Sequence, residues 1–164
     1  MVRKVRLAVF SWSRLVLVSR LVLGGLFIYA GLEKVIYSEQ FAELVFNYKL
    51  LPTEAVNLVA LVLPWLEILA GFLLIMGLFT LPAAAILVFL VLVFVGAVGF
   101  NLARGLDFQC GCFSASTEAR NATLATLLRD IALLVPAAIC LIEALGQESR
   151  LSARLRLMGP DRPE

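Results

Sequence analysis

The chain has 164 residues, and 62% of them are hydrophobic. Its mean hydropathy is +0.97. A soluble domain contains only about 45–50% apolar residues, so this composition excludes an ordinary water-soluble domain and indicates a membrane protein. The formal net charge is small, at +2, and the chain has no histidine. Histidine-ligated haem or zinc and histidine-dependent catalytic triads are therefore excluded.

Four apolar stretches have the length that a membrane-spanning helix requires, which is about 20 residues for roughly 30 Å of hydrocarbon. They cover residues 15–36, 55–79, 81–102 and 122–144. The sequence therefore predicts an all-α integral membrane protein, a four-helix bundle that forms one domain over 15–144. A basic N-terminal segment, 1–14, precedes it, and a basic tail, 145–164, follows as a short helix that frays into coil.

The basic residues predict the orientation of the bundle, because positive charge next to spans is retained on the cytoplasmic side. Eight of the fourteen Lys and Arg residues belong to the two ends of the chain. They are Arg3, Lys4, Arg6, Arg14, Arg150, Arg154, Arg156 and Arg162. Both termini are therefore predicted to be cytoplasmic. This places the loops 37–54 and 103–121 on the extracytoplasmic side of a bacterial cell (inner) membrane.

The first predicted span carries polar and small residues on one helical face. Spacings of four, three, four and three join Arg20, Gly24, Phe27, Gly31 and Lys34. Small residues allow a neighbouring backbone to approach, and a cation near each end can reach the interface or a carboxylate. For Arg20 this pattern favours helix packing with snorkelling. For Lys34 a functional role is an equal alternative.

The second predicted span repeats the pattern, with Glu67 close to the middle of the bilayer. Its face consists of Ala60, Pro64, Glu67, Gly71 and Leu74. A charge in lipid costs on the order of 3 kcal/mol, so Glu67 must be protonated, paired or exposed to a watery cleft. We expect Arg129 to be its partner, with Lys34 and Arg104 as the alternatives. The pair either serves function or merely sets the helix register.

Two prolines lie within the predicted spans, Pro64 and Pro136. Each removes a helix hydrogen bond, so the sequence predicts local bends beside the charged residues.

Two cysteines one glycine apart, in Cys110-Gly111-Cys112, lie in the second outer loop. The glycine supplies the backbone freedom that a small, strained disulfide ring requires. Strain makes a disulfide easier to reduce and so favours thiol exchange over a structural bridge. Two thiolates also suit Cu(I) or Zn(II), although further ligands would have to come from elsewhere, and an inert pair is the third interpretation. Cys140, with apolar neighbours, is expected to be inert.

The chain resembles the MauE branch of the DoxX-like membrane proteins, named for methylamine utilisation. The resemblance runs from about residue 20 to residue 130 and depends on fragments in a characteristic order. They are Tyr29-Ala30-Gly31-Leu32-Glu33-Lys34, Tyr48-Lys49-Leu50-Leu51-Pro52, Leu63-Pro64-Trp65-Leu66-Glu67 with Gly71, Arg104-Gly105, Cys110-Gly111-Cys112-Phe113 and Arg129-Asp130. The chain departs from the family at Ser114, where Gly is common.

The resemblance implies a four-helix membrane protein that takes part in forming or maintaining the disulfides of a periplasmic amine dehydrogenase. The architecture is also similar to that of bundles in which electrons pass from a thiol pair to a membrane quinone. Neither implication follows from composition or spacing.

We therefore predict a thiol-disulfide redox protein in which Cys110 and Cys112 exchange electrons with an extracytoplasmic partner, a thioredoxin-like protein or a client that needs disulfides. A quinone is expected between the outer helix ends, with Trp65, Glu67 and Arg129 lining its pocket and Lys34 and Arg104 as supporting polar groups. The lipid bilayer is the other partner, and no nucleic acid is expected. A non-catalytic membrane anchor and a thiolate-based metal-handling protein are the alternatives.

Overall fold

The computed structural model describes residues 2–50, 52–104 and 124–157, with side-chain burial described for 12–50, 52–104 and 127–153. The described residues are helical apart from short turns and links. The helices are α1 (Val2–Ile36), α2 (Ser38–Asn47), α3 (Thr53–Met76), α4 (Thr80–Ala103), α5 (Leu124–Ala132) and α6 (Leu134–Leu157). The all-α prediction is confirmed for this part of the chain.

Three of the predicted spans are helices long and apolar enough to cross a bilayer. They are the α1 segment Trp12–Ile36, α3 and α4. In each, the backbone groups pair within the helix, as hydrocarbon requires, and most side chains are apolar. The structure and the composition together identify the chain as a membrane protein.

The fourth predicted span, 122–144, is not one continuous helix in the described part of the chain. Two helices, α5 and α6, meet at Leu133, whose amide donates to the carbonyls of Arg129 and Asp130 at 3.3 and 3.2 Å. Pro136 has no amide hydrogen for the carbonyl of Ala132, which explains why the regular helix is interrupted one turn before it. The predicted bend at Pro136 is therefore a break between helices. Pro64, by contrast, lies inside the continuous helix α3.

The predicted outer loop 37–54 contains a helix, α2, that the sequence analysis missed. Its Phe41 and Leu44 are buried, whereas Glu39 and Glu43 on its other face are exposed. This amphipathic pattern explains why α2 lies on α3 instead of extending into water. Lys49, with φ of 51°, ends the turn that follows α2.

The closest helix packing joins α1 to α3 through glycines on the two faces that the sequence indicated. A Cβ atom at Gly24 would lie 2.7 Å from the carbonyl oxygen of Gly71, and one at Gly71 would lie 2.7 Å from the carbonyl oxygen of Gly24. Only hydrogen fits between these backbones. The two glycines therefore set the distance between α1 and α3.

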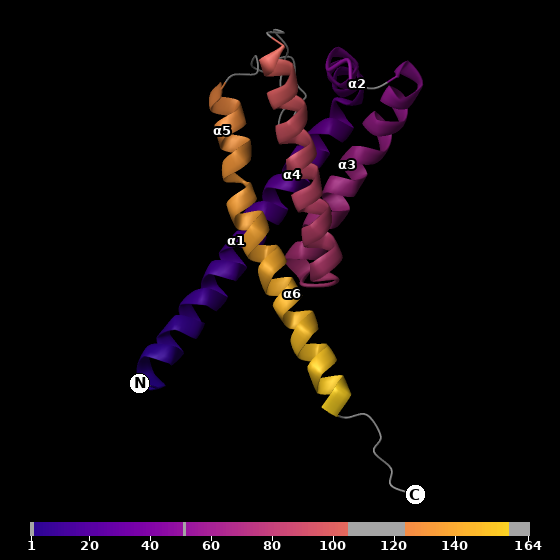
Figure 1. The fold of residues 1–164 in the computed structure, drawn as a ribbon. Coiled ribbons are helices and arrows are strands. Elements are labelled where there is room, and N and C mark those ends of the chain that lie inside the picture. Colours follow the sequence, from indigo (N-terminus) through magenta and orange to yellow (C-terminus); the bar gives the residue numbers. More distant parts are fainter. Residues whose placement is uncertain (1, 51, 105–123, 158–164) are drawn as a thin grey trace, which may run out of the picture.

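The other helices complete the bundle around this pair (Figure 1). Helices α3 and α4 meet at the 77–79 turn and diverge toward the opposite end, while α6 packs against both α1 and α4. The buried hydrophobic core lies where α1, α3, α4 and α6 meet. It consists of Leu23, Phe27, Ala70, Leu74, Ala83, Ala84, Leu87, Leu90, Val91, Ala137 and Cys140.

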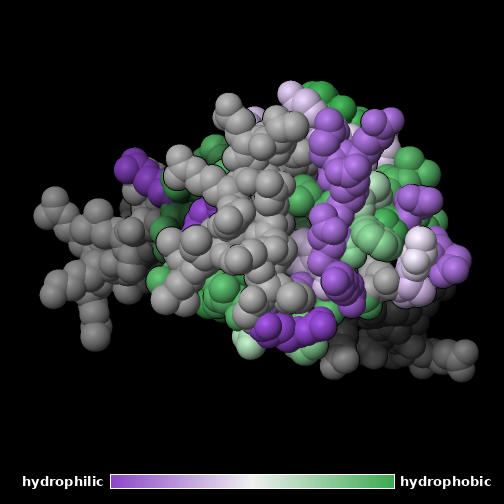
Figure 2. Space-filling model, turned by 90° about the horizontal axis from the view of Figure 1, so that it is seen from above, coloured by the Kyte–Doolittle hydropathy of each residue, from purple (hydrophilic) through white to green (hydrophobic). Residues whose placement is uncertain are grey.

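The start of α1 and the end of α6 lie at one end of the bundle, and α2 lies at the other (Figure 1). Figure 2 looks down on the α2 end and shows hydrophilic side chains gathered there, with hydrophobic ones at the margins. Exposed polar residues of this end include Glu39, Glu43, Asn47 and Lys49. The other end of the bundle carries the two ends of the sequence, which hold eight of the fourteen Lys and Arg residues. The two ends of the bundle therefore differ in composition.

Candidate functional site

A buried ion pair joins α1 and α3. The ammonium of Lys34 donates to both carboxylate oxygens of Glu67, at 3.0 and 2.9 Å, and the two side chains are 1% and 0% exposed. Two hydrogen bonds from one charged donor to the charged acceptor offset part of the cost of removing both groups from water. Both carboxylate oxygens of Glu67 are therefore paired inside the bundle.

The backbone around the pair explains why these two side chains meet. A Cβ atom at Gly31 would lie 2.7 Å from the carbonyl oxygen of Pro64 and 3.3 Å from Cβ of Glu67. Because Gly31 has no side chain, α1 approaches α3 at this level. The two helices run in opposite directions, so Glu67 lies at the level of Gly31, and Lys34, one turn further along α1, reaches back to its carboxylate. The face of small residues that the sequence indicated thus positions the charged pair.

The expected pairing of Glu67 with Arg129 is wrong, because Lys34 occupies both carboxylate oxygens. Arg129 instead donates from Nε and Nη2 to one oxygen of Asp130, at 3.1 and 3.0 Å. Its side chain is 52% exposed, whereas that of Asp130 is 3% exposed. Lys34 was one of the two alternatives that the sequence indicated. The other, Arg104, is exposed at the end of α4, with its guanidinium 5.4 Å from the ring centre of Phe100.

Two aromatic rings lie close to the Lys34 ammonium. Its nitrogen lies 5.6 Å from the ring centre of Phe41 in α2 and 5.4 Å from that of Phe94 in α4. Both distances lie within the range of cation–π attraction. Neither ring was expected at this site, because Phe41 belongs to a segment predicted to be a loop and Phe94 to a uniformly apolar run, and neither pattern indicates contacts between helices.

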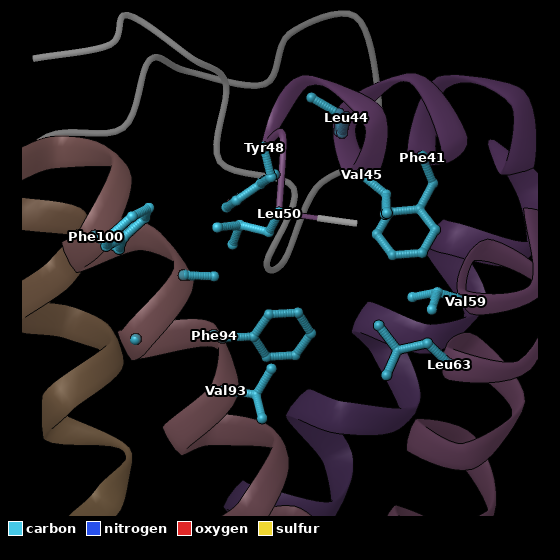
Figure 3. A pocket seen from close by; sticks show the side chains of 12 residues that line it. Phe41, Leu44, Val45, Tyr48, Leu50, Val59, Leu63, Val93, Phe94 and Phe100 are labelled. Atoms are coloured by element: carbon cyan, nitrogen blue, oxygen red, sulfur yellow. The ribbon is translucent and has the colours of Figure 1, made fainter. Parts of the chain in front are cut away.

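The same two rings line an apolar fissure between α2, α3 and α4. Figure 3 shows side chains of the three helices and of the link after α2 directed into this space. Its volume is about 410 Å³. The lining residues are Phe41, Leu44, Val45, Tyr48, Leu50, Val59, Leu63, Val93, Phe94, Gly96, Ala97 and Phe100. The fissure forms because α3 and α4 diverge toward the α2 end (Figure 1).

The structure does not bring together the three residues from which we expected a pocket: Glu67 is buried against Lys34, Arg129 contacts Asp130, and Trp65 faces outward. Trp65 is 59% exposed and belongs to a shallow surface hollow with Leu61 and Leu69. Two positions along a helix correspond to a rotation of about 200°, so Trp65 and Glu67 lie on opposite faces of α3. Trp65 faces outward, and the apolar space beside the ion pair is the fissure on the other side.

Two further buried polar side chains have atoms without a hydrogen-bond partner in the described structure. The side chain of Asn101 in α4 is fully buried, and neither its oxygen nor its nitrogen has a partner. Oδ2 of Asp130 is also buried without a partner. Such atoms cost about 1–3 kcal/mol each, so they are uncommon where only stability matters. A lone Asn in the apolar run 81–102 was the signal that could have identified Asn101.

At the opposite end of the bundle, Arg20 caps α3. Its Nε donates to the carbonyl oxygen of Leu74 at 3.0 Å, and Gly77, with φ of 76°, ends the helix beside the guanidinium. A cation at a helix C-terminus interacts favourably with the free carbonyls and the helix dipole. The structural interpretation of Arg20 is therefore supported by this contact.

The thiol pair Cys110 and Cys112 lies outside the described residues. Cys140 is a free, buried cysteine in the core, in keeping with the inert role expected for it. Within the described ranges, no group of three or more Cys, Asp or Glu side chains is arranged to hold a metal ion.

These features define a helical integral membrane protein with a buried ion pair beside an apolar fissure. Comparison with known proteins shows the family to which the chain belongs. A sequence profile described as methylamine utilisation protein MauE matches residues 12–143, and the chain belongs to the MauE family.

Relatives of the same name support this assignment. The methylamine utilization protein MauE of Paracoccus denitrificans is 36% identical over 129 residues, which cover 73% of this chain and 69% of the relative. That of Methylophilus methylotrophus is 33% identical over 130 residues, covering 76% and 68%. That of Methylorubrum extorquens is 33% identical over 118 residues, covering 66% and 63%. No solved structure matches the chain.

Proposed function

We propose that the protein is a thiol-disulfide oxidoreductase of the membrane, with Cys110 and Cys112 as its reactive groups. The observation that carries the proposal is the Cys110-Gly111-Cys112 sequence between α4, a candidate membrane span, and α5, in a chain that has one other cysteine, the buried Cys140. The names of the relatives place them in methylamine utilisation. The client proposed here is accordingly a protein of a methylamine-type pathway that needs disulfides, reached directly or through a thioredoxin-like protein.

The reaction proceeds by thiol exchange. A client thiolate attacks the Cys110–Cys112 disulfide and forms a mixed disulfide, which releases one of the two cysteines as a thiolate. The second client thiolate then attacks the mixed disulfide, so that the client is oxidised and the Cys110–Cys112 pair is reduced. Two electrons and two protons must leave the pair before the next cycle. A membrane quinone, which becomes a quinol, is the proposed acceptor.

The proposed orientation places the thiols on the extracytoplasmic side of a bacterial inner membrane and both termini in the cytoplasm. The basic residues at the two ends of the sequence support this arrangement. In this topology α5 and the first half of α6 together provide the fourth crossing, since they run along α4 from the α2 end of the bundle toward the other (Figure 1).

A trapping experiment tests the redox role. With Cys112→Ser, the Cys110 thiolate can attack the disulfide of an oxidised client, in the reverse of this exchange, and release one client thiolate. Because Cys112 is not there to resolve the mixed disulfide, a reductant-sensitive adduct that depends on Cys110 should accumulate on a nonreducing gel. Cys140→Ser is the matched control and should leave the wild-type pattern unchanged, because Cys140 is buried in the core. The purified protein should also oxidise dithiothreitol when a quinone is present. Full activity of the Cys110→Ser/Cys112→Ser variant would contradict the proposal and favour a non-catalytic membrane anchor.

A further inference from the structure

We infer that the apolar fissure between α2, α3 and α4 binds the ring of a membrane quinone, with the ring next to Phe41 and Phe94. This inference concerns the electron acceptor and depends on the proposed function for its role, although the binding itself can be measured without thiol chemistry. It replaces the pocket of Trp65, Glu67 and Arg129 that the sequence indicated. The aromatic lining of the fissure, its access from the bilayer and the ammonium close to its rings support this assignment.

The fissure is open on the side where a lipid-soluble molecule arrives. Val93 and Phe100 on its α4 side are 47% and 52% exposed, and both belong to a helix that is long and apolar enough to span the membrane. Leu50, on the link after α2, is also exposed. A molecule dissolved in the bilayer therefore reaches the fissure sideways, without crossing water.

The lining of the fissure suits a flat ring better than a saturated chain. Four of the residues that line it are aromatic: Phe41, Tyr48, Phe94 and Phe100. Aromatic rings gain additional stabilisation from offset or edge-to-face contacts with another ring, which an acyl chain cannot supply. The volume, about 410 Å³, lies within the range of small-molecule sites. A substituted quinone ring with the start of its tail has this size and shape.

The charge behind the lining complements an electron acceptor. The Lys34 ammonium lies 5.6 and 5.4 Å from the centres of two rings that line the fissure. The Glu67 carboxylate of α3, 2.9 Å away, balances the charge of this ammonium. We expect the ammonium, held close to both ring centres, to stabilise electron density that develops on quinone oxygens beside the rings, because charges interact strongly in a medium of low dielectric constant.

The electron balance of the site is complete with one quinone for each disulfide. Oxidation of the two thiols of Cys110 and Cys112 forms one S–S bond and releases two electrons and two protons. The quinone takes up both electrons and both protons and becomes a quinol. The quinol leaves to the bilayer through the same lateral opening.

Gly96 offers a direct way to close the fissure. It lines the space, and a Cβ atom built there has no neighbour within 4 Å, so Gly96→Leu places a side chain in the fissure without striking the backbone. Gly25 in α1 provides the control, because it is also an exposed helix glycine with no atom within 4 Å of its Cβ and lies outside the fissure. Both leucines are compatible with a helix, so both variants are expected to fold.

Photolabelling of the full chain in phosphatidylcholine nanodiscs measures the binding. An azido derivative of a short-chain ubiquinone should label peptides of α2, α3 or α4, and excess decylubiquinone should suppress the label. The Gly96→Leu variant should lose about tenfold of this labelling, whereas Gly25→Leu should retain it. The Cys110→Ser/Cys112→Ser variant should be labelled like the wild type, because binding precedes electron transfer.

Different failures of the experiment have different meanings. The inference would be overturned if Gly96→Leu were labelled as strongly as the wild type. It would also be overturned if an azido phospholipid labelled the same peptides equally and decylubiquinone did not suppress the labelling. Either result would identify the fissure as lipid-filled. If the fissure failed to bind quinone but the protein kept its thiol-exchange activity, the proposed function would stand, and the electron acceptor would bind elsewhere. If the fissure binds quinone but the double Ser variant keeps full activity, the quinone site stands and the thiol proposal fails.

Discussion

Lys34 and Glu67 illustrate how a membrane interior makes two charged residues depend on each other. Breaking a buried pair leaves one charge without compensation, which costs about 3–5 kcal/mol, whereas replacing both partners by apolar residues of similar size is often neutral or stabilising. The ion pair is fully buried, with both carboxylate oxygens bonded to the same ammonium. The pair thus provides a test of whether it serves stability or chemistry.

We predict that Lys34→Met lowers the free energy of unfolding by about 3–5 kcal/mol and that Lys34→Met/Glu67→Leu recovers most of this loss. Denaturation of the purified protein in detergent, followed by circular dichroism, measures both. Thiol exchange by the double variant then separates the two roles: a folded but inactive protein assigns the pair to chemistry, and a folded, active one assigns it to helix register. A double variant as unstable as the single would refute the coupling.

For Asn101 we predict that an apolar substitution raises stability, whereas the single substitution of Lys34 lowers it. Because its buried amide has no partner in the described structure, Asn101→Leu removes two unsatisfied polar atoms while keeping the branched shape of the side chain. We expect the free energy of unfolding to rise by about 1–2 kcal/mol. Asn57→Leu, at an exposed position in α3, serves as the control for added hydrophobicity. A loss of stability in Asn101→Leu would show that the amide is satisfied by bound water or by a ligand.

The partner of Glu67 could not be identified from sequence patterns alone. Spacing along one helix identified Glu67 as a buried group that needs a partner, since three- and four-residue steps define a face. The choice between Lys34 and Arg129 depends instead on how two helices are rotated and shifted relative to each other. That arrangement depends on where Gly31 allows the backbone of Pro64 to approach.

At the scale of the helices, small residues decide how α1 and α3 pack. We predict that Gly71→Leu destabilises the protein by at least about 1–3 kcal/mol, because its Cβ would collide with the carbonyl oxygen of Gly24 and force the helices apart. Gly25→Leu, which meets open space, should stay within about 0.5 kcal/mol of the wild type. Thermal unfolding in detergent compares them. Equal effects of the two substitutions would mean that this close contact does not stabilise the bundle.

Most helices followed from the apolar runs, whereas α2 and the break at Leu133 did not. The runs that form α1, α3 and α4 are long enough to be identified without tertiary information. The segment of α2 is short and half polar, so its helix depends on packing Phe41 and Leu44 against α3. Pro136 indicated a bend, but whether a proline bends a helix or divides it depends on the packing around it, as the continuous helix at Pro64 shows.

At the scale of the whole molecule, the orientation in the membrane is the prediction to test. A membrane-impermeant maleimide should label Cys110 and Cys112 in intact spheroplasts after mild reduction, because the positive-inside rule places their loop outside. Cys110→Ser/Cys112→Ser should remain unlabelled until the protein is denatured, since the remaining thiol, Cys140, is buried. Labelling of the wild type that begins only after the membrane is broken would reverse the proposed topology.

Hydrophobicity and charge along the chain were enough to indicate a helical membrane protein, three of its crossing helices, the faces on which they pack and the need of Glu67 for a partner. These properties are local, because burial in lipid requires each helix to satisfy its own backbone and to hide its own charges. The pairing of Lys34 with Glu67, the rings around the ammonium and the fissure arise where α1, α2, α3 and α4 meet. Their positions depend on the rotation and divergence of the helices, which packing determines and which no single segment encodes.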